Sequence, residues 1–219
     1  PDYVLVPEGE RDAFVEALVD QIRARYPSLD GNPDFTRIVN DGQFQRLQGY
    51  LREAQARGAT VIQPVTVDAA RAEADNLLAP TLVVDPPGDT ALMQEEIFGP
   101  ILPVLGYRDL DQALADVHRR DRPLAFYLFD QDRTRAEKVL SRIVAGGVTL
   151  NDTVMHYAQP NLPFGGVGAS GMGHYHGEAG FLTFSKLMPV FRQARISGMA
   201  LFKPPYRGLA DRLVAFLTR

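Results

Sequence analysis

The sequence Leu-Ala-Phe-Tyr-Leu-Phe at positions 124–129 is a nearly continuous apolar run, and an amphipathic stretch lies on each side of it. Such runs are typical of strands that are covered on both faces of a sheet. Before the run, Asp109 precedes an apolar stripe at helical spacing; after it, Thr134 and Glu137 form a capping-box pattern. Further strands are predicted at positions 101–107 and 147–150. This alternation predicts an α/β fold with a largely parallel sheet and flanking helices.

The region before it shows the same kinds of pattern. Apolar residues recur at helical spacing over positions 11–25 and again from about 43 to 57, where Asn40 or Asp41 can cap the helix. Positions 64–76 have no clear period and are predicted to form a surface excursion. Short strands are predicted at positions 3–6, 59–62 and 78–84. No internal repeat or linker divides this α/β region.

Composition narrows the functional classes. The chain has 219 residues, of which 45% are hydrophobic and 23% are charged, and its net charge is -4. The isoelectric point near 5.6 gives no electrostatic case for a nucleic-acid partner or an acidic membrane. The absence of cysteine removes disulfides, thiolate metal ligands and a thiolate nucleophile within these residues, and it favours a reducing, cytoplasmic location. No apolar run approaches the roughly 18 residues of a membrane helix.

The start of the chain indicates part of a longer protein. It begins Pro-Asp-Tyr and enters a strand-like run at once, without an initiator methionine or a basic signal-peptide region.

The first chemically informative motif is Glu-Glu-Ile-Phe-Gly-Pro at positions 95–100. In an extended segment Glu95 and Glu96 point to opposite faces, whereas Glu96 and Phe98 share one. A carboxylate beside an aromatic ring suits a nucleoside, because the carboxylate accepts hydrogen bonds from ribose hydroxyls while the ring covers a flat heterocycle. A surface turn with two solvated glutamates and Phe98 in the core explains the same spacing.

The second motif is a loop with five glycines at positions 162–173. It has no Lys-Ser/Thr ending and is not a phosphate-binding P-loop, and it is a poor dinucleotide-binding fingerprint. A tight irregular connection is the alternative to a ligand-binding role. Within it, the rigid neighbours Pro163 and Gly165 hold the aromatic ring of Phe164 at a fixed angle.

The histidines give no metal site. His174 and His176 lack a third ligand at a suitable spacing. His156 falls between a strand and a loop, where it can line a pocket. Asn151 and Asp152 end a strand, a position that serves either a functional polar group or a simple turn.

The C-terminal part departs from the strand–helix alternation. Ser185–Ala194 is β-leaning and contains Pro189, which suits an edge strand that pairs with another chain. Positions 208–219 predict an amphipathic helix.

The two motifs, in this order and at this separation, resemble the C-terminal half of the aldehyde dehydrogenase superfamily. The resemblance covers essentially the whole chain. Met93-Gln94 and the Gly-Met-Gly-His-Tyr-His-Gly stretch at 171–177 look most like the class 3 branch. Gly-Asn-Pro-Asp at 31–34 and Phe-Arg-Gln at 191–193 look closest to coniferyl aldehyde dehydrogenases.

The resemblance implies roles for matching residues. Glu96 would hold the nicotinamide ribose of NAD or NADP, and Phe98 would pack beside the nicotinamide ring. Phe164 would line the substrate tunnel for an aldehyde of aromatic, coniferyl-like type. Tyr157, Ala158 and His176 would lie at the tunnel mouth.

The resemblance also implies a division of the chain. Residues 1–184 would be an N-terminally truncated part of the catalytic domain, and residues 185–197 the oligomerisation strand of a homodimer, formed through Ser185–Ala194. Residues 198–219 would be a tail with its helix. The catalytic cysteine, which forms the thioester, would lie just before Pro1, and the general-base glutamate further upstream, so the chain alone would be inactive.

Two other classes of function remain open from the sequence. One is a non-catalytic relative that keeps the sheet and the dimer strand as a binding or assembly module. The other is a stand-alone nucleotide-binding domain, which needs a phosphate loop that the sequence does not show. The codons upstream of Pro1 separate the first from the dehydrogenase: a nearby cysteine favours the enzyme.

Overall fold

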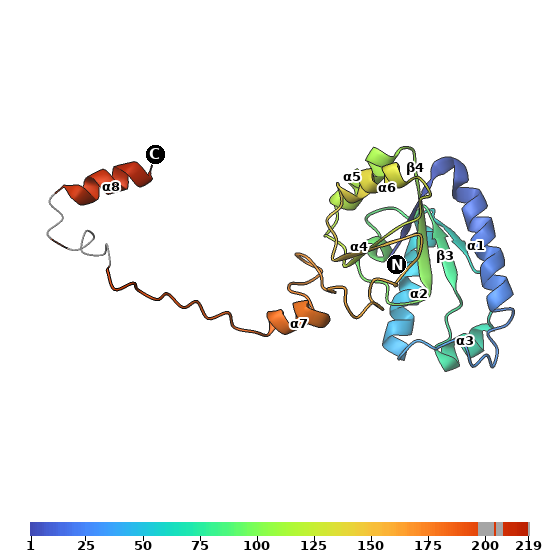
Figure 1. The fold of residues 1–219 in the computed structure, drawn as a ribbon. Coiled ribbons are helices and arrows are strands. Elements are labelled where there is room, and N and C mark those ends of the chain that lie inside the picture. Colours follow the sequence, from blue (N-terminus) through green and yellow to red (C-terminus); the bar gives the residue numbers. More distant parts are fainter. Residues whose placement is uncertain (197–203, 205–207, 219) are drawn as a thin grey trace.

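The structure is a computed structural model that describes residues 1–196, 204 and 208–218 (Figure 1). Within these residues the strands form one four-stranded and one two-stranded sheet, with helices around them. Three of the four strand pairs are parallel. The predicted α/β class, with a largely parallel sheet and flanking helices, is therefore confirmed, although the strands divide between two sheets.

The four-stranded sheet is built from the first part of the chain. Its strands, in the spatial order β1-β4-β3-β2, are β1 (Val4–Pro7), β4 (Ile101–Tyr107), β3 (Thr81–Val84) and β2 (Thr60–Ile62). Only β2 runs antiparallel, against β3. Val83 and Val104 at the sheet centre are fully buried, as expected for β-branched residues with helices on both sides.

Helices cover both faces of this sheet. Figure 1 shows α1 on one face and α2 with α4 on the other. The elements are the 3₁₀ turn Glu8–Glu10, α1 (Arg11–Arg25), α2 (Asp41–Ala56), α3 (Ala69–Asp75) and α4 (Ala91–Gln94). Of the two caps considered for α2, Asn40 is the one that caps the helix, because its side chain accepts a hydrogen bond from the Gln43 backbone amide. The surface excursion predicted at 64–76 is wrong in part, because Asp68 caps the short helix α3 there.

The main core lies between α2 and the sheet. Phe44, Leu47, Tyr50 and Ala54 form the buried stripe of α2. They belong to one cluster with Val83 of β3, Ile101 of β4 and Ile97, which precedes β4. Each such side chain contributes roughly 1.5–3 kcal/mol on burial, so this contact fixes α2 against the start of β4.

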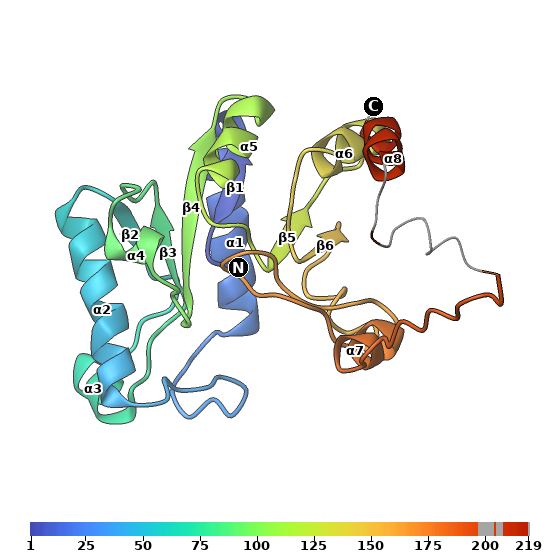
Figure 2. The same ribbon diagram turned by 90° about the vertical axis from the view of Figure 1, so that its left-hand side faces the viewer.

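The two-stranded sheet follows the first one along the chain. Strands β5 (Ala125–Leu128) and β6 (Gly147–Leu150) pair in parallel, and Figure 2 shows them as a separate layer beside the four-stranded sheet. The flanking helices are α5 (Leu110–His118) and α6 (Arg133–Leu140). Asp109 caps α5 as predicted, but the capping box at Thr134 is wrong: Asp132 caps α6. β5 is half-buried rather than covered on both faces.

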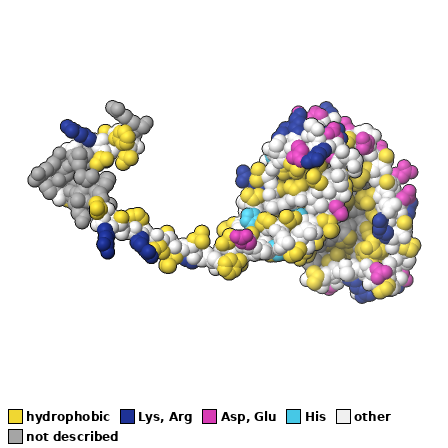
Figure 3. Space-filling view, in the orientation of Figure 1, with side chains coloured by type: hydrophobic (Ala, Val, Ile, Leu, Met, Phe, Trp, Pro, Cys, Tyr) yellow, Lys and Arg dark blue, Asp and Glu magenta, His cyan; other side chains and the backbone are white. Residues whose placement is uncertain are grey.

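The chain after the glycine loop is largely irregular and exposed. After the short helix α7 (Gly177–Thr183), residues 185–196 form no helix or strand, and the side chains of Leu187, Val190 and Phe191 are exposed. Figure 3 shows hydrophobic side chains along this segment. The predicted strand Ser185–Ala194 has no partner within the described chain, and its pairing with a second copy stays a prediction.

The predicted C-terminal helix is present as α8 (Leu209–Leu217). Positions 197–203, 205–207 and 219 of the predicted strand end and tail lie outside the described residues. Among the described helices, none combines the length and the apolar character that crossing a bilayer requires.

Candidate functional site

The loop that carries the first motif is anchored through buried contacts. We call residues Glu95–Gly99, between α4 and β4, the clamp loop. Ile97 at its centre is only 2% exposed and packs in the α2 core. A Cβ atom at Gly99 would lie 2.5 Å from Cδ1 of Leu47, so a larger residue there would force the buried Leu47 side chain of α2 to shift. The loop is therefore held at both its middle and its end.

Arg46 of α2 fixes the backbone of the same loop. Its guanidinium donates to the carbonyl oxygens of Glu96 at 3.0 Å and Ile97 at 2.7 Å. It also donates through Nε to Gln43 Oε1 at 2.7 Å, and its charge lies 4.9 Å from the ring centre of Tyr50. Hydrogen bonds from a charged donor are stronger than neutral ones, so these contacts set the course of the loop.

The two adjacent glutamates have different surroundings. Tyr50 donates its hydroxyl hydrogen to Glu95 Oε2 at 2.6 Å, which turns Glu95 toward α2. Burial raises the pKa of Tyr50, and the hydrogen bond to Glu95 raises it further, so the phenol stays protonated as the donor. Glu96 is exposed, and no hydrogen bond or ion pair to its carboxylate is found among the described residues.

The extended geometry assumed for this motif is wrong, and the reason is Phe98. Its φ of +50° lies in the left-handed region, and residues 95–99 belong to no strand. The period-two argument that put Glu96 and Phe98 on one face therefore does not apply. The structure also excludes the placement of Phe98 in the core, because its side chain is 82% exposed. Ile97 fills the core, and Glu96 and Phe98 both stand in solvent.

The second group of site residues surrounds Phe164. We call His156, Tyr157, Phe164, Tyr175 and His176 the aromatic cluster. The ring of Phe164 lies 5.2 Å from that of Tyr157 and 5.3 Å from that of Tyr175, both edge to face, and 6.1 Å from that of His176. Edge-to-face pairs at these separations are favourable beyond their buried area. The structure thus brings together Tyr157, Phe164 and His176, three residues expected at the substrate tunnel.

Ala158 follows Tyr157 and is exposed. No hydrogen bond or aromatic contact in the described chain ties its side chain to the cluster. It lies next to Tyr157 of the cluster in sequence.

His156 is the buried member of the cluster. Its Nδ1 lies 2.8 Å from Thr149 Oγ1 of β6, and its ring centre is 5.7 Å from that of Phe164. Its Nε2 is buried and has no hydrogen-bond partner among the described residues. A Cβ atom at Gly147 would lie 2.4 Å from the ring, so glycine at the start of β6 makes room for it. The position of His156 after a strand had suggested that it can line a pocket. The contact of Tyr175 with Phe164, in contrast, had no signal in the sequence.

The glycines of the second motif serve close packing. A Cβ atom at Gly165 would lie 2.1 Å from the carbonyl oxygen of Gly173, and one at Gly166 would lie 2.0 Å from that of Ser170. Phe164 and Tyr175 also exchange backbone hydrogen bonds of 3.0 and 2.8 Å. The loop therefore folds back on itself tightly, and this supports the reading as an irregular connection that fixes Phe164.

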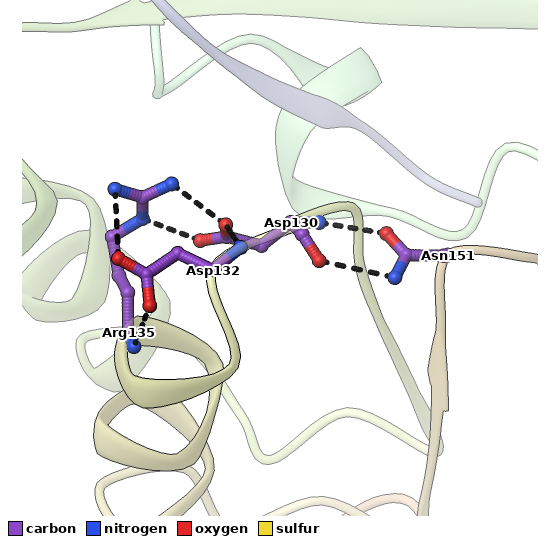
Figure 4. A network of polar contacts seen from close by, with 4 residues as sticks. All are labelled: Asp130, Asp132, Arg135 and Asn151. Atoms are coloured by element: carbon purple, nitrogen blue, oxygen red, sulfur yellow. Dashed lines mark hydrogen bonds and ion pairs between the residues drawn. The ribbon is translucent and has the colours of Figure 1, made fainter.

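A polar network at the ends of β5 and β6 holds the segment that leads to the cluster (Figure 4). The Asp130 amide donates to Asn151 Oδ1 at 2.8 Å, and Asn151 Nδ2 donates to the Asp130 carbonyl at 3.0 Å. Asn151 has a φ of +56°, which asparagine tolerates better than most residues. Of the two readings of Asn151, the structural turn is the one observed.

Arg135 of α6 completes this network. It donates to both carboxylate oxygens of Asp130, at 2.5 and 2.6 Å. The hydrogen bond from Arg135, with a second from the Asp132 amide, lowers the pKa of Asp130 below its ordinary value. The Asp130 side chain is only 8% exposed, so this pair fixes the strand end more firmly than a solvated surface pair would.

The clamp loop and the aromatic cluster are separate groups in this chain. The first is anchored to α2 and the four-stranded sheet, and the second follows the two-stranded sheet. A shallow cavity of about 520 Å³ lies elsewhere, lined by the end of α5 with the segment after it, by Val144, and by Gly168 and Ala169 at the tip of the glycine loop, and it includes none of the predicted site residues. No set of three or more potential metal-ligating side chains converges within the described chain.

Comparison with known proteins shows which family this chain matches. The family described as "Aldehyde dehydrogenase family" matches residues 1–190. A "Probable coniferyl aldehyde dehydrogenase" of Pseudomonas aeruginosa is 46% identical over 98% of this chain and 44% of its own length. The "Coniferyl aldehyde dehydrogenase" of a Pseudomonas species is 45% identical over 99% of the chain and 46% of its own length. The "4,4'-diaponeurosporen-aldehyde dehydrogenase" of Staphylococcus aureus is 42% identical over 99% and 46%.

Solved structures of aldehyde dehydrogenases also match this chain. Staphylococcus aureus AldH in its substrate-bound state matches with a TM-score of 0.78 at 41% identity, covering 99% of this chain and 46% of that one. An NAD+ complex of an aldehyde dehydrogenase from Bacillus cereus matches with a TM-score of 0.73 at 24% identity, over 84% of this chain and 37% of that one, which shows the shared fold. The chain spans less than half the length of these relatives.

Replacing Asp130 with asparagine tests the network at the strand ends. Because the folded-state pKa of Asp130 is lowered, its contribution to stability is present above the ordinary aspartate pKa and is lost as the pH falls below roughly 4. We expect Asp130→Asn to destabilise the chain at pH 7 and the difference from wild type to shrink in acid. Urea unfolding at several pH values measures this. Asp20→Asn, on the exposed face of α1, is the control, and a difference that stays constant with pH would contradict the assignment.

Proposed function

The chain belongs to the aldehyde dehydrogenase family, and we propose that it forms part of the cofactor and substrate walls of an NAD(P)-dependent enzyme that oxidises an aldehyde to its carboxylic acid. The observation that carries the proposal is the clamp loop. It is held from α2, yet it leaves the ring of Phe98 exposed and the exposed carboxylate of Glu96 without a hydrogen-bond partner among the described residues. A loop whose only role was to connect α4 to β4 would not need to hold Phe98 in the left-handed region, where a bulky side chain is disfavoured.

The clamp loop fits a nicotinamide nucleoside. The Glu96 carboxylate is an acceptor without a partner among the described residues, and ribose hydroxyls are donors of matching chemistry. The exposed ring of Phe98 offers a flat apolar surface. NAD(P)+ bound there would supply the hydride acceptor. The role of this chain is to bind and orient it.

The aromatic cluster is the candidate substrate wall. Phe164 lies at its centre, and Tyr157, Tyr175 and His176 surround it. Such a set of rings can stack against a planar, conjugated aldehyde. The names of the Pseudomonas relatives support a coniferyl-type aldehyde as the substrate class. Ala158, as a small exposed neighbour of Tyr157, would leave room at the tunnel mouth.

The nucleophile must come from outside these 219 residues, because they contain no cysteine. In the proposed enzyme a thiolate would add to the aldehyde carbonyl to give a thiohemiacetal, loss of hydride to NAD(P)+ would turn this into a thioester, and hydrolysis would release the acid and the free thiol. The chain contributes binding surfaces to this chemistry and no reacting group of its own. The proposed location, the cytoplasm, rests on the cysteine-free sequence.

Self-association through Ser185–Ala194 is part of the same proposal. The segment is extended and exposed, with apolar side chains at Leu187, Val190 and Phe191. An apolar segment with unpaired backbone groups favours pairing with another chain, and a two-fold contact would bury it in a homodimer.

The role of Glu96 is tested by Glu96→Gln in the full-length enzyme that contains this chain. Loss of a charge-assisted hydrogen bond costs about 1.5–3 kcal/mol, so we expect a roughly ten- to hundredfold loss in the hydride-transfer rate or in NAD(P)+ affinity. Steady-state and single-turnover kinetics measure both. Glu137→Gln on the exposed face of α6 is the matched control. An unchanged rate together with an unchanged cofactor KM would rule out this role.

The substrate class is tested with coniferaldehyde, hexanal and acetaldehyde. We expect kcat/KM to be highest for coniferaldehyde. Phe164→Leu, which keeps an apolar side chain but removes the ring, should lower kcat/KM for coniferaldehyde by about three- to tenfold, since aromatic pairs contribute roughly 0.5–1.5 kcal/mol. Phe164→Leu should leave kcat/KM for hexanal unchanged.

Phe35→Leu, in the Tyr26–Phe35 pair at the end of α1, makes the same replacement away from the cluster. A wild-type preference for acetaldehyde would remove the coniferyl assignment and leave the family assignment in place. Equal losses for coniferaldehyde and hexanal in Phe164→Leu would show that the ring acts only through its bulk.

The isolated 219-residue chain allows self-association and the lack of dehydrogenase activity to be tested together. We expect it to associate, and the double variant Val190→Lys, Phe191→Lys to be monomeric, because charges disfavour pairing of an edge. Light scattering measures both, and a dehydrogenase assay should show no activity. Val39→Lys, Met172→Lys places two charges at equally exposed apolar positions and should still associate. A monomeric wild type, or aldehyde-dependent NADH formation, would contradict the prediction.

A further inference from the structure

We infer that Arg46 is a positioning residue of the proposed cofactor site: it acts through the clamp loop and sets where Glu96 and Phe98 stand. The inference rests on the proposed function for those two residues. Arg46 lies on α2, about 50 positions away in sequence from the loop that it holds. It is half-buried and points to the loop backbone, so it would act without touching the cofactor.

The contacts of Arg46 fix the peptide groups on which the two side chains depend. The carbonyl of Glu96 and the carbonyl of Ile97 are successive acceptors of one guanidinium, at 3.0 and 2.7 Å. Holding these carbonyls sets the ψ angles of Glu96 and Ile97, and therefore the direction of the Glu96 side chain and the entry into Phe98. Phe98 then keeps a φ of +50°, which a non-glycine residue adopts only when its surroundings require it.

An arginine suits this position for geometric reasons. Its planar fork carries several donors in fixed directions, so one side chain reaches two carbonyls, while Nε remains for Gln43. The same guanidinium lies over the ring of Tyr50 and contacts its hydroxyl at 2.5 Å. A lysine offers a single charged centre and can reproduce only part of this set.

Tyr50 and Glu95 form a second set of contacts that hold the clamp loop. Tyr50 receives a hydrogen bond from Arg46 and donates one to Glu95 at 2.6 Å. Both side chains are exposed, but Glu95 is hydrogen-bonded to α2 at the start of the clamp loop, whereas the Glu96 carboxylate has no hydrogen-bond partner among the described residues. The structure therefore assigns different roles to two adjacent and chemically identical residues: Glu95 positions the loop, and Glu96 faces the cofactor.

The test compares Arg46→Ala, Arg46→Lys and Arg52→Ala in the full-length enzyme. Arg52 lies on the exposed side of α2, and its side chain hydrogen-bonds only to Gln48 among the described residues, so its variant controls for the loss of a helix arginine. We expect Arg46→Ala to raise the NAD+ dissociation constant about tenfold or more. Arg46→Lys should recover part of this loss, and Arg52→Ala should match wild type. The aldehyde KM at saturating cofactor should stay within about twofold of wild type in all three.

A second measurement follows the loop without reference to activity. The Glu95 amide bonds to the Ala91 carbonyl at 2.9 Å, and the Ile101 amide bonds to the Gly99 carbonyl at 2.9 Å. Hydrogen–deuterium exchange at these two amides should be faster in Arg46→Ala, intermediate in Arg46→Lys and unchanged in Arg52→Ala. Unchanged exchange in Arg46→Ala would overturn the inference, whatever the kinetics show.

The outcomes separate this inference from the proposed function. If Glu96→Gln weakens cofactor binding and Arg46→Ala does not, the positioning role is wrong and the proposed function stands. If neither variant alters the hydride-transfer rate or cofactor binding but Arg46→Ala speeds exchange, Arg46 anchors the loop, and the cofactor role proposed for Glu96 is wrong together with the positioning role of Arg46. If Arg46→Ala lowers the melting temperature and worsens cofactor and aldehyde parameters equally, with no recovery by lysine, Arg46 is a general structural residue and the inference is overturned.

Discussion

The packing of the apolar stripe of α2 against the four-stranded sheet is the contact on which the placement of the candidate cofactor site depends. Phe44, Leu47 and Tyr50 bury one side of the helix, and Ile97 of the clamp loop joins the same cluster. The helix therefore has one possible rotation, and that rotation brings Arg46 to the loop carbonyls. Apolar burial supplies the free energy, and the charged hydrogen bonds supply the geometry.

A different kind of constraint places the aromatic cluster. The amide-to-carbonyl exchange between Asp130 and Asn151 joins the ends of two parallel strands, and Arg135 holds the Asp130 carboxylate from α6. From this fixed point the chain turns back, so that His156 lies against Thr149 and next to Phe164. The tight packing of Gly165 and Gly166 then fixes the other side of Phe164. Two segments on either side of Phe164 are thus held by polar contacts and by glycine packing rather than by a large apolar core.

The two candidate sites lie on different sheets of one chain, and this agrees with a chain that spans less than half the length of its relatives. In the proposed enzyme each sheet would present one wall: Glu96 and Phe98 for a nicotinamide nucleoside, and the aromatic cluster for a planar aldehyde. The proposed thiolate would belong to neither, because the chain has no cysteine. A protein whose chemistry requires both walls to meet one nucleophile needs them to be rigid, and the anchors around each wall provide this rigidity.

Periodicity in the sequence predicted the α/β class, the helices α1, α2 and α5 and the strand β4. A helix or strand that buries one face repeats its apolar residues at its own characteristic spacing, and this spacing can be read from the sequence. Two motifs singled out Glu96, Phe98 and Phe164 as candidate site residues, and these roles stay predictions; the extended geometry used to pair Glu96 with Phe98 was wrong. The sequence patterns missed α3, and they chose Thr134 where Asp132 caps α6, since several polar residues can cap the same turn. Only the tertiary structure separated Glu95 from Glu96, put Phe98 in the left-handed region and brought Arg46 to the loop. These features depend on contacts between residues about 50 positions apart, and no local pattern records such contacts.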